Sequence, residues 1–198
     1  MAKAFSEKEK TIIQNKLKQG AKECLQRFGV RKTTVDELVR IAGISKGAFY
    51  IFYPTKEALF FEIMSEFQLE VQNQILKSLK EKEDDITPER LTNLIYNMIK
   101  EIEQSFMLTM IQNGDLEYIQ RKLPEDILAD HRIDDDFILG ELCKLLPLEI
   151  NQKKIELFSA SLRGVAMTLT AKKAIGDIYF DDVLMILLKG VVNELYKK

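Results

Sequence analysis

The chain has 198 residues, of which 46% are hydrophobic and 30% charged, and its formal net charge is −2. This composition is typical of a globular protein with a substantial buried core. The longest uncharged run, residues 104–114, is well short of the roughly 20 apolar residues that a membrane span needs, and the charged N-terminus lacks the apolar core of a signal peptide. We therefore expect a cytoplasmic protein with no membrane partner.

The charge is distributed unevenly along the chain. Residues 1–56 contain 12 Lys+Arg and 5 Asp+Glu, a net charge of +7, whereas residues 57–198 contain 17 and 26, a net charge of −9. A basic segment on an acidic body allows only one end of a protein to approach a polyanion. Charge alone fits an ordinary solvated helix face equally well.

Local signals predict a first helix close to the N-terminus. Ser6 and Glu9 have the spacing of a capping box, in which each residue satisfies a backbone amide of the other. Apolar residues then recur at helical intervals as far as Phe28. We expect the helix to end at Gly29, because glycine readily adopts the left-handed conformation of a helix C-terminus.

Two shorter helices are predicted next. Thr34 and Glu37 repeat the capping box, and the helix that they begin should stop at Gly43. A third helix can begin at Ser45. It must end before Pro54, because proline lacks the amide hydrogen and disfavours helical geometry in the residue before it.

The rest of the chain is also predicted to be helical. Apolar periodicity indicates helices over residues 55–79, 88–102, 151–173 and 180–197, with shorter pieces between residues 105 and 150. We find no convincing strand pattern and no internal repeat. The expected fold class is all-α.

The second and third helices, joined by a glycine turn, fit a helix-turn-helix. In this motif the second helix packs on the first and leaves its opposite side free for the major groove of DNA. Phe49 and Tyr53 share one face of the second helix, and we expect Gly47, Ala48 and Ile51 to share the other. Small residues on that exposed face would permit close approach to DNA.

A longer pattern surrounds the motif, with consistent order and spacing over about 30 positions. It consists of Thr33, Thr34, Val35, Leu38, residues 42–47, Phe49, Tyr50, Tyr53, Lys56, Glu57 and Leu59. The pattern resembles the DNA-binding domain of the tetracycline-repressor (TetR) family of bacterial transcription regulators. The resemblance implies a DNA-binding domain over residues 1–56, continuing to about residue 67, and a helical regulatory and dimerisation domain over residues 57–198.

The resemblance also implies which residues bind DNA. They are Thr34, Lys46, Gly47, Ala48, Tyr50, Ile51 and Lys56. Thr34, Tyr50 and Lys56 would contact backbone phosphates, Lys46 and Gly47 would open the recognition helix against the groove, and Ala48 and Ile51 would face base edges. The alternative for Tyr50 is a half-buried aromatic residue with a hydrated hydroxyl. Taken without the surrounding motif, Lys56 would be read as a solvated lysine.

Two residues depart from the family pattern. Ile51 stands where a polar or basic residue is frequent, so base reading is expected to rely on thymine methyl contacts and DNA shape. Phe52 stands where histidine or tyrosine often meets a phosphate. Whether Phe52 faces the protein core or DNA is open at this point.

The resemblance implies that the C-terminal body senses a ligand and forms a homodimer. Independent support comes from the last helix, whose apolar residues cover more than one face; a two-fold four-helix interface would bury the excess. The expected interface residues are Phe158, Leu162, Val165, Leu184, Leu187, Leu188, Val191 and Leu195. The alternative is that both final helices are internal core of a monomer.

A pocket for a largely apolar small-molecule effector is expected among the central helices, where methionine and aromatic side chains can adapt to varied ligands. The candidate lining residues are Met98, Phe106, Met107, Met110, Tyr118, Phe137 and Met167. Such residues more commonly serve as plain core.

Catalytic and metal-binding motifs are missing from the sequence. The only histidine, His131, lies among aspartates, which is more typical of a solvated loop with a helix cap than of a metal site. Cys24 and Cys143 form no metal or redox motif, and we find neither a glycine-rich phosphate loop nor a nucleophile motif. We therefore expect no enzyme activity, metal or cofactor, and predict a DNA-binding transcriptional regulator, a ligand-responsive repressor that binds a palindromic operator. The alternatives are a helical protein-interaction module or a small helical enzyme that does not bind DNA.

Overall fold

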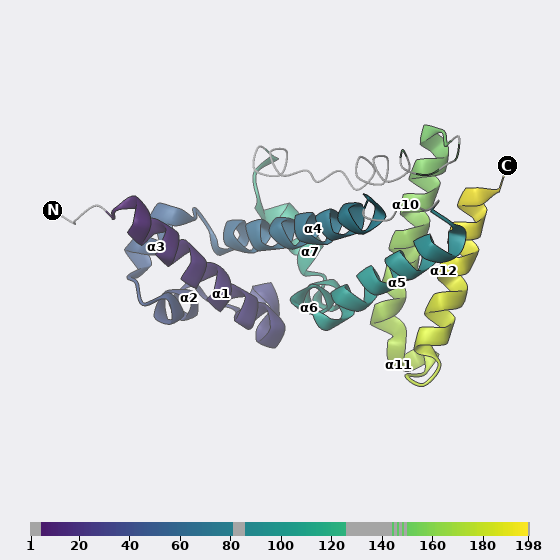
Figure 1. Ribbon diagram of the computed structural model, residues 1–198. Helices are drawn as coiled ribbons and strands as arrows, with labels where there is room; N and C mark the ends of the chain where they lie inside the picture. The colour runs from purple at the N-terminus through teal and green to yellow at the C-terminus, as the bar shows by residue number, and fades with distance from the viewer. Residues whose placement is uncertain are drawn as a thin grey trace. The chain divides into compact units, whose positions relative to one another are not determined.

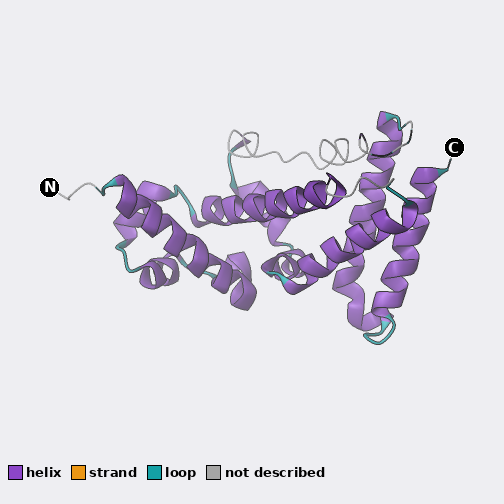
Figure 2. Cartoon of the chain, viewed as in Figure 1, coloured by secondary structure: helices purple, strands orange, loops and turns teal. Residues whose placement is uncertain are grey.

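A computed structural model of the chain describes residues 5–80, 86–125, 144, 146, 148 and 150–197. All regular structure in these residues is helical, which confirms the predicted all-α class (Figure 1, Figure 2). The elements are α1 (Glu7–Lys32), α2 (Val35–Ala42), α3 (Lys46–Phe52), α4 (Lys56–Lys80), α5 (Pro88–Gln104), α6 (Phe106–Asn113), α7 (Asp115–Lys122), α10 (Gln152–Met167), the 3₁₀ turn η1 (Thr168–Ala171), α11 (Lys172–Ile175) and α12 (Phe180–Tyr196). None of the described helices combines the length and apolar character needed to cross a membrane.

The helices form two compact units. Unit 1 comprises Met1–Glu66 and Ser105–His131, and unit 2 comprises Phe67–Gln104 and Arg132–Lys198. Helix α4 therefore begins in unit 1 and continues into unit 2. The predicted boundary at residue 56 separates a DNA-binding function from a regulatory one and does not coincide with a boundary of the two compact units. It stays a prediction.

Helix α1 begins as its sequence predicts but continues past its predicted end at Gly29, as far as Lys32. Ser6 Oγ accepts a hydrogen bond from the Glu9 amide at 3.3 Å, and a Glu9 carboxylate oxygen accepts one from the Ser6 amide at 2.8 Å. Regular helical geometry is interrupted at Gly29, whose φ of 74° and ψ of 179° are far from helical values. The last residues of α1 are a short helical segment beyond this kink.

Helices α2 and α3 form the predicted helix-turn-helix. The capping box of Thr34 and Glu37 is present. Gly43 has a φ of 70°, in the left-handed region that favours glycine, and its amide donates a hydrogen bond to the carbonyl of Val39. Phe49 is fully buried and anchors α3 in the core of unit 1.

Helix α1 also packs against the beginning of α4. The Lys18 ammonium forms ion pairs with Glu62 at 2.6 Å and with Glu66 at 2.5 Å. Leu59 and Phe60 on the same part of α4 are fully buried. The ion pairs and this apolar face fix the start of α4 within the unit that contains the helix-turn-helix.

Unit 2 is built around α12, which packs against both α5 and α10 (Figure 1). Its core contains Leu91, Ile95 and Ile99 from α5, Phe158, Leu162 and Val165 from α10, and Phe180, Leu184, Leu188, Val192 and Leu195 from α12. The helix predicted over residues 151–173 differs from the structure, because α10 ends at Met167 and η1 and α11 follow. The Thr168 hydroxyl donates to the Val165 carbonyl at 2.6 Å, a local bond that competes with continuation of the α-helix.

Candidate nucleic-acid interface

Helix α3 presents an open surface over part of its length. Ser45 caps the helix by accepting a hydrogen bond from the Ala48 amide at 3.2 Å. Gly47 is exposed, and a Cβ there would meet only Ser45 Oγ, at 4.0 Å. Tyr50 is 51% exposed and Ile51 is 67% exposed. Gly47, Tyr50 and Ile51 are therefore accessible to a ligand, as the sequence predicts.

Ala48 is placed differently from the sequence-based expectation. Its relative exposure is only 8%, and it adjoins the fully buried Phe49. The step of about 100° per helical residue turns Ala48 toward the packed side of α3. The methyl group of Ala48 contributes to packing, and the outward face consists of Gly47, Tyr50 and Ile51; the expected contact of Ala48 with base edges stays a prediction.

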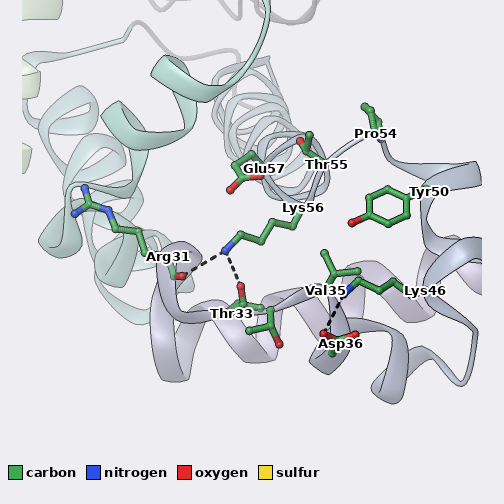
Figure 3. A pocket seen from close by; sticks show the side chains of 11 residues that line it. Arg31, Thr33, Val35, Asp36, Lys46, Tyr50, Pro54, Thr55, Lys56 and Glu57 are labelled. Carbon is green, nitrogen blue, oxygen red and sulfur yellow. Dashed lines mark hydrogen bonds and ion pairs between the residues drawn. The ribbon is translucent and has the colours of Figure 1, made fainter.

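An open hollow of about 420 Å³ lies beside α3 (Figure 3). It is lined by Arg31, Thr33, Thr34, Val35, Asp36, Lys46, Tyr50, Pro54, Thr55, Lys56 and Glu57. These residues come from the end of α1, the start of α2, helix α3 and the start of α4. The hollow thus brings together several of the residues that the sequence predicts to bind DNA.

Two helix N-termini border this hollow. Thr34 is the N-cap of α2, and Thr55 Oγ1 accepts a hydrogen bond from the Ala58 amide in the first turn of α4 at 3.1 Å. A helix N-terminus carries partial positive charge and unpaired amides, both of which favour an anion. The start of α2 also holds a negative charge of its own, because hydrogen bonds from the backbone and then the hydroxyl of Thr34 lower the pKa of Glu37.

Lys46 is available on the rim of the hollow. Its ammonium pairs with Asp36 at 3.1 Å, but the side chains are 53% and 72% exposed. An ion pair this exposed contributes little to stability and exchanges readily for another anion. Together with the accessible hydroxyl of Tyr50, the Lys46 ammonium could bind a phosphate group at this rim.

Lys56 is held by the protein itself. Its ammonium donates to the carbonyl oxygens of Thr33 at 2.6 Å and Arg31 at 3.4 Å (Figure 3), and to that of Val30 at 2.8 Å. These carbonyls lie at the C-terminus of α1, where helices carry partial negative charge. The Lys56 side chain thus binds the end of α1 in this structure, and its expected contact with a phosphate stays a prediction.

Phe52 is neither fully in the protein core nor fully exposed to a DNA ligand. It is half-buried, and its ring centroid is 5.9 Å from that of Phe5, with an interplanar angle of 38°. The N-terminal segment therefore covers part of the Phe52 ring. An aromatic contact replaces the polar contact that the family pattern would place here.

Sequence reasoning missed Arg31, Thr33 and Asp36 as lining residues of the hollow. Thr33 was within the recognised pattern, but its side chain is fully buried and donates to the Gly29 carbonyl at 2.7 Å. Arg31 is brought to the site by the kink in α1. The only local signal for it is a basic residue directly after a predicted helix end, which is too common to be specific.

The residues predicted to line an effector pocket are distributed over both units. Phe106, Met107, Met110 and Tyr118 belong to unit 1, Met98 and Met167 belong to unit 2, and Phe137 lies outside the described residues. The three residues on α6 are buried, whereas Met167 is 56% exposed. Their role in ligand binding stays a prediction.

Most of the predicted dimer residues are buried by their own chain. Phe158, Leu162, Val165, Leu184, Leu188 and Leu195 have relative exposures of 8% or less, Val191 is half-buried, and Leu187 is 39% exposed. A side chain that is already buried has little surface left for a second copy. The exposed apolar residues on the same two helices are instead Leu157 and Met167 on α10 and Ile186 and Leu187 on α12.

Within the described part of the chain, no group of three or more His, Cys, Asp and Glu side chains could hold a metal ion. His131 and its neighbouring aspartates, residues 130–136, lie outside that part.

Comparisons with known proteins agree with this geometry. Residues 18–63 match the family described as "Bacterial regulatory proteins, tetR family". YuxN of Bacillus subtilis (strain 168), an uncharacterized HTH-type transcriptional regulator, is 33% identical over 119 residues, which are 59% of this chain and 38% of that relative. The alignment thus spans little more than a third of the curated relative.

Similar solved structures cover nearly the whole chain. The transcriptional regulator FadR from Bacillus subtilis in complex with stearoyl-CoA has a TM-score of 0.60 and 19% identity, covering 91% of this chain and 96% of that one. The Thermus thermophilus FadR, a TetR-family transcriptional repressor in complex with lauroyl-CoA, has a TM-score of 0.58 and 19% identity, covering 92% of each chain. At these identities the likeness shows the fold alone.

Proposed function

We propose that the chain is a TetR-family regulator, a sequence-specific DNA-binding transcriptional repressor that is released by a small-molecule effector, because residues 18–63 match the tetR family of bacterial regulatory proteins. The observation that carries the proposal is the open face of α3 beside a hollow bordered by two helix N-termini. Since the family is one of regulatory proteins, we propose no enzymatic activity for the chain.

On DNA, Gly47 and Ile51 would enter the major groove. The open space beside Gly47 allows close approach of the helix backbone, and Ile51 offers an apolar contact to thymine methyl groups. Lys46, Tyr50 and Thr34 would bind phosphates on the rim of the hollow. In this proposal Gly47 and Ile51 read the base sequence, and the three phosphate-binding residues orient the protein on the duplex.

The proposed regulator is a homodimer. Support comes from the exposed apolar residues Leu157 and Met167 on α10 and Ile186 and Leu187 on α12. Gly164 and Gly190 lie on the same helices, and a Cβ at either position would meet no atom within 4 Å. A second copy could therefore approach their backbones closely. A two-fold axis through this surface would present two α3 helices to a palindromic operator.

The proposed effector is a long-chain acyl-CoA. Support is limited to the ligands named for the two FadR structures, stearoyl-CoA and lauroyl-CoA. Binding would act by population shift, with the effector preferring a conformation that binds DNA poorly. The predicted residues on α6, Phe106, Met107 and Met110, suit an acyl chain, because methionine adapts to flexible apolar ligands.

Selection of bound sequences from a random duplex library tests the DNA-binding proposal. We expect enrichment of a palindrome whose half-sites are about one helical turn apart, with an affinity that falls steeply as salt increases. Failure to enrich any motif would overturn the proposed function. Addition of lauroyl-CoA or stearoyl-CoA, with free CoA as the control, then tests the effector: unchanged affinity with both acyl-CoAs would exclude that class while leaving DNA binding intact.

A further inference from the structure

Asp115 is a buried acid far in sequence from the helix-turn-helix. Its side chain is 1% exposed, and its Oδ2 accepts a hydrogen bond from the Val30 amide at 2.9 Å. Asp115 is the first residue of α7, and Val30 follows the kink of α1. The bond therefore joins the α6–α7 turn to the last residues of α1, all within unit 1.

The kink at Gly29 makes this contact sterically feasible. A Cβ on Gly29 would lie 2.4 Å from Asn113 Nδ2 and 2.7 Å from Asp115 Oδ2, so a larger residue would displace these two side chains. The positive φ of Gly29 also takes the Val30 amide out of the regular helical hydrogen-bond pattern. The Asp115 carboxylate satisfies that amide where water has no access.

The same stretch of backbone is held from its other side by Lys56. The Lys56 ammonium binds the Val30 and Thr33 carbonyls, while Asp115 binds the Val30 amide. Residues 30–33 are therefore fixed between the start of α7 and the start of α4. Thr34, the N-cap of α2 and a lining residue of the hollow, follows directly.

Arg31 adds a second connection between the same parts. Its guanidinium donates to the Gly114 carbonyl at 3.1 Å, lies 3.8 Å from Asp115 Oδ1, and sits over the Tyr118 ring at 5.1 Å. Arg31 lines the hollow as well. The α6–α7 turn thus contacts the rim of the proposed DNA-binding surface through both the backbone and a side chain.

We infer that Asp115 is a positioning residue for DNA binding, which holds residues 30–33 and the start of α2 in the geometry that binds phosphate. The inference rests on the proposed function. Asp115 acts through the Val30 amide and does not itself touch DNA. Any displacement of the α6–α7 turn would be passed to the start of α2 by the same bond.

The first test compares Asp115→Ala with Asp115→Asn on the duplex recovered by selection. The alanine variant leaves the buried Val30 amide without an acceptor, so we expect the Kd of its folded fraction to rise about tenfold or more. The asparagine variant keeps an acceptor oxygen at nearly the same place, so its Kd should stay within about threefold of the unaltered chain. Titration to stoichiometry gives the active fraction and separates weaker binding from partial unfolding.

Thr92→Val is the matched control. Thr92 is 2% exposed, belongs to unit 2, and donates a hydrogen bond to the Pro88 carbonyl at 2.7 Å. Its replacement also removes a buried polar interaction, but we expect no change in Kd. If Asp115→Ala does not fold, Gly29→Ala takes its place, because the added methyl group would meet the Asp115 carboxylate and displace it from the Val30 amide.

The outcomes are separable from those of the proposed function. If the unaltered chain binds no duplex, the proposed function and the inference fall together. If it binds, an unchanged Kd for the folded fraction of Asp115→Ala or its replacement Gly29→Ala overturns the inference alone. Equal weakening in Asp115→Asn and Asp115→Ala also overturns it, because the acceptor oxygen would then not be the positioning group.

Discussion

Replacing Lys56 by methionine distinguishes a structural lysine from a phosphate-binding one. Methionine retains an unbranched apolar stem but removes the ammonium from the carbonyls of Thr33 and Val30, which it binds at 2.6 and 2.8 Å. Hydrogen bonds to a charged group are worth roughly 1.5–3 kcal/mol each. Because water can replace part of the interaction at this half-buried site, we expect the free energy of unfolding to fall by about 2 kcal/mol.

Two assays check this expectation. Urea denaturation measures the change in the free energy of unfolding, and the dependence of Kd on salt counts the phosphates that the protein neutralises. Because the protein's own carbonyl groups hold the ammonium away from DNA phosphates, Lys56→Met should leave the salt slope unchanged. The exposed Lys46 serves as the comparison: Lys46→Met removes two phosphate contacts from the proposed dimer, so it should lower the magnitude of the slope by about 1.8 with little effect on stability.

The reverse pattern would refute the structural reasoning. If Lys56→Met lost about 1.8 from the salt slope of the dimer while its free energy of unfolding was unchanged, each Lys56 ammonium would be neutralising a phosphate in the complex. The carbonyl contacts would then contribute nothing measurable to the fold.

Further predictions concern base reading, assembly and acid stability. Ile51→Ala should change base preference at particular operator positions rather than weaken binding uniformly, measured by repeating the library selection. Ile186→Glu would bury a charge in the proposed interface and should yield a monomer in sedimentation at micromolar concentration; an unchanged dimer would place the interface elsewhere. Burial opposes ionisation of Glu103, yet hydrogen bonds from Lys100 and Lys172 outweigh it and hold its pKa below 4.5. The depressed pKa adds stability above pH 4.5 that is lost as pH falls through the folded-state value, so melting temperatures of the unaltered chain and Glu103→Gln should converge in acid.

Local signals in the sequence predicted the local features of unit 1. The capping boxes at Ser6 and Thr34 form as expected, and Gly29 and Gly43 adopt positive φ at the predicted helix ends. Each of these features depends on residues within about four positions of one another, which is the range over which helix caps and turns are determined. The helix-turn-helix could therefore be placed before its structure was known.

Other features depend on contacts that spacing alone does not encode. Residues Val30 and Asp115 are 85 positions apart, and neither belongs to a recognisable motif. The carbonyl partners of Lys56, on Val30 and Thr33, depend on how the end of α1 lies beside the start of α4, which the spacing of residues does not encode. Ala48 lies on the boundary between two faces of α3, where a small error in the assumed helix rotation reverses the expected exposure.

The discontinuity of unit 1 limits how the protein can be engineered. Residues 105–131 belong to the same compact unit as residues 1–66, although the chain between them belongs to unit 2. A chimera that transplants only the first 56 residues onto another regulatory body would leave the Val30 amide without Asp115 and the Gly29 kink without the turn that fills it. Operator specificity is therefore better exchanged by grafting the outward residues of α3 than by exchanging N-terminal segments. Substitutions on that one helix face leave the contacts of Val30 and Gly29 in place.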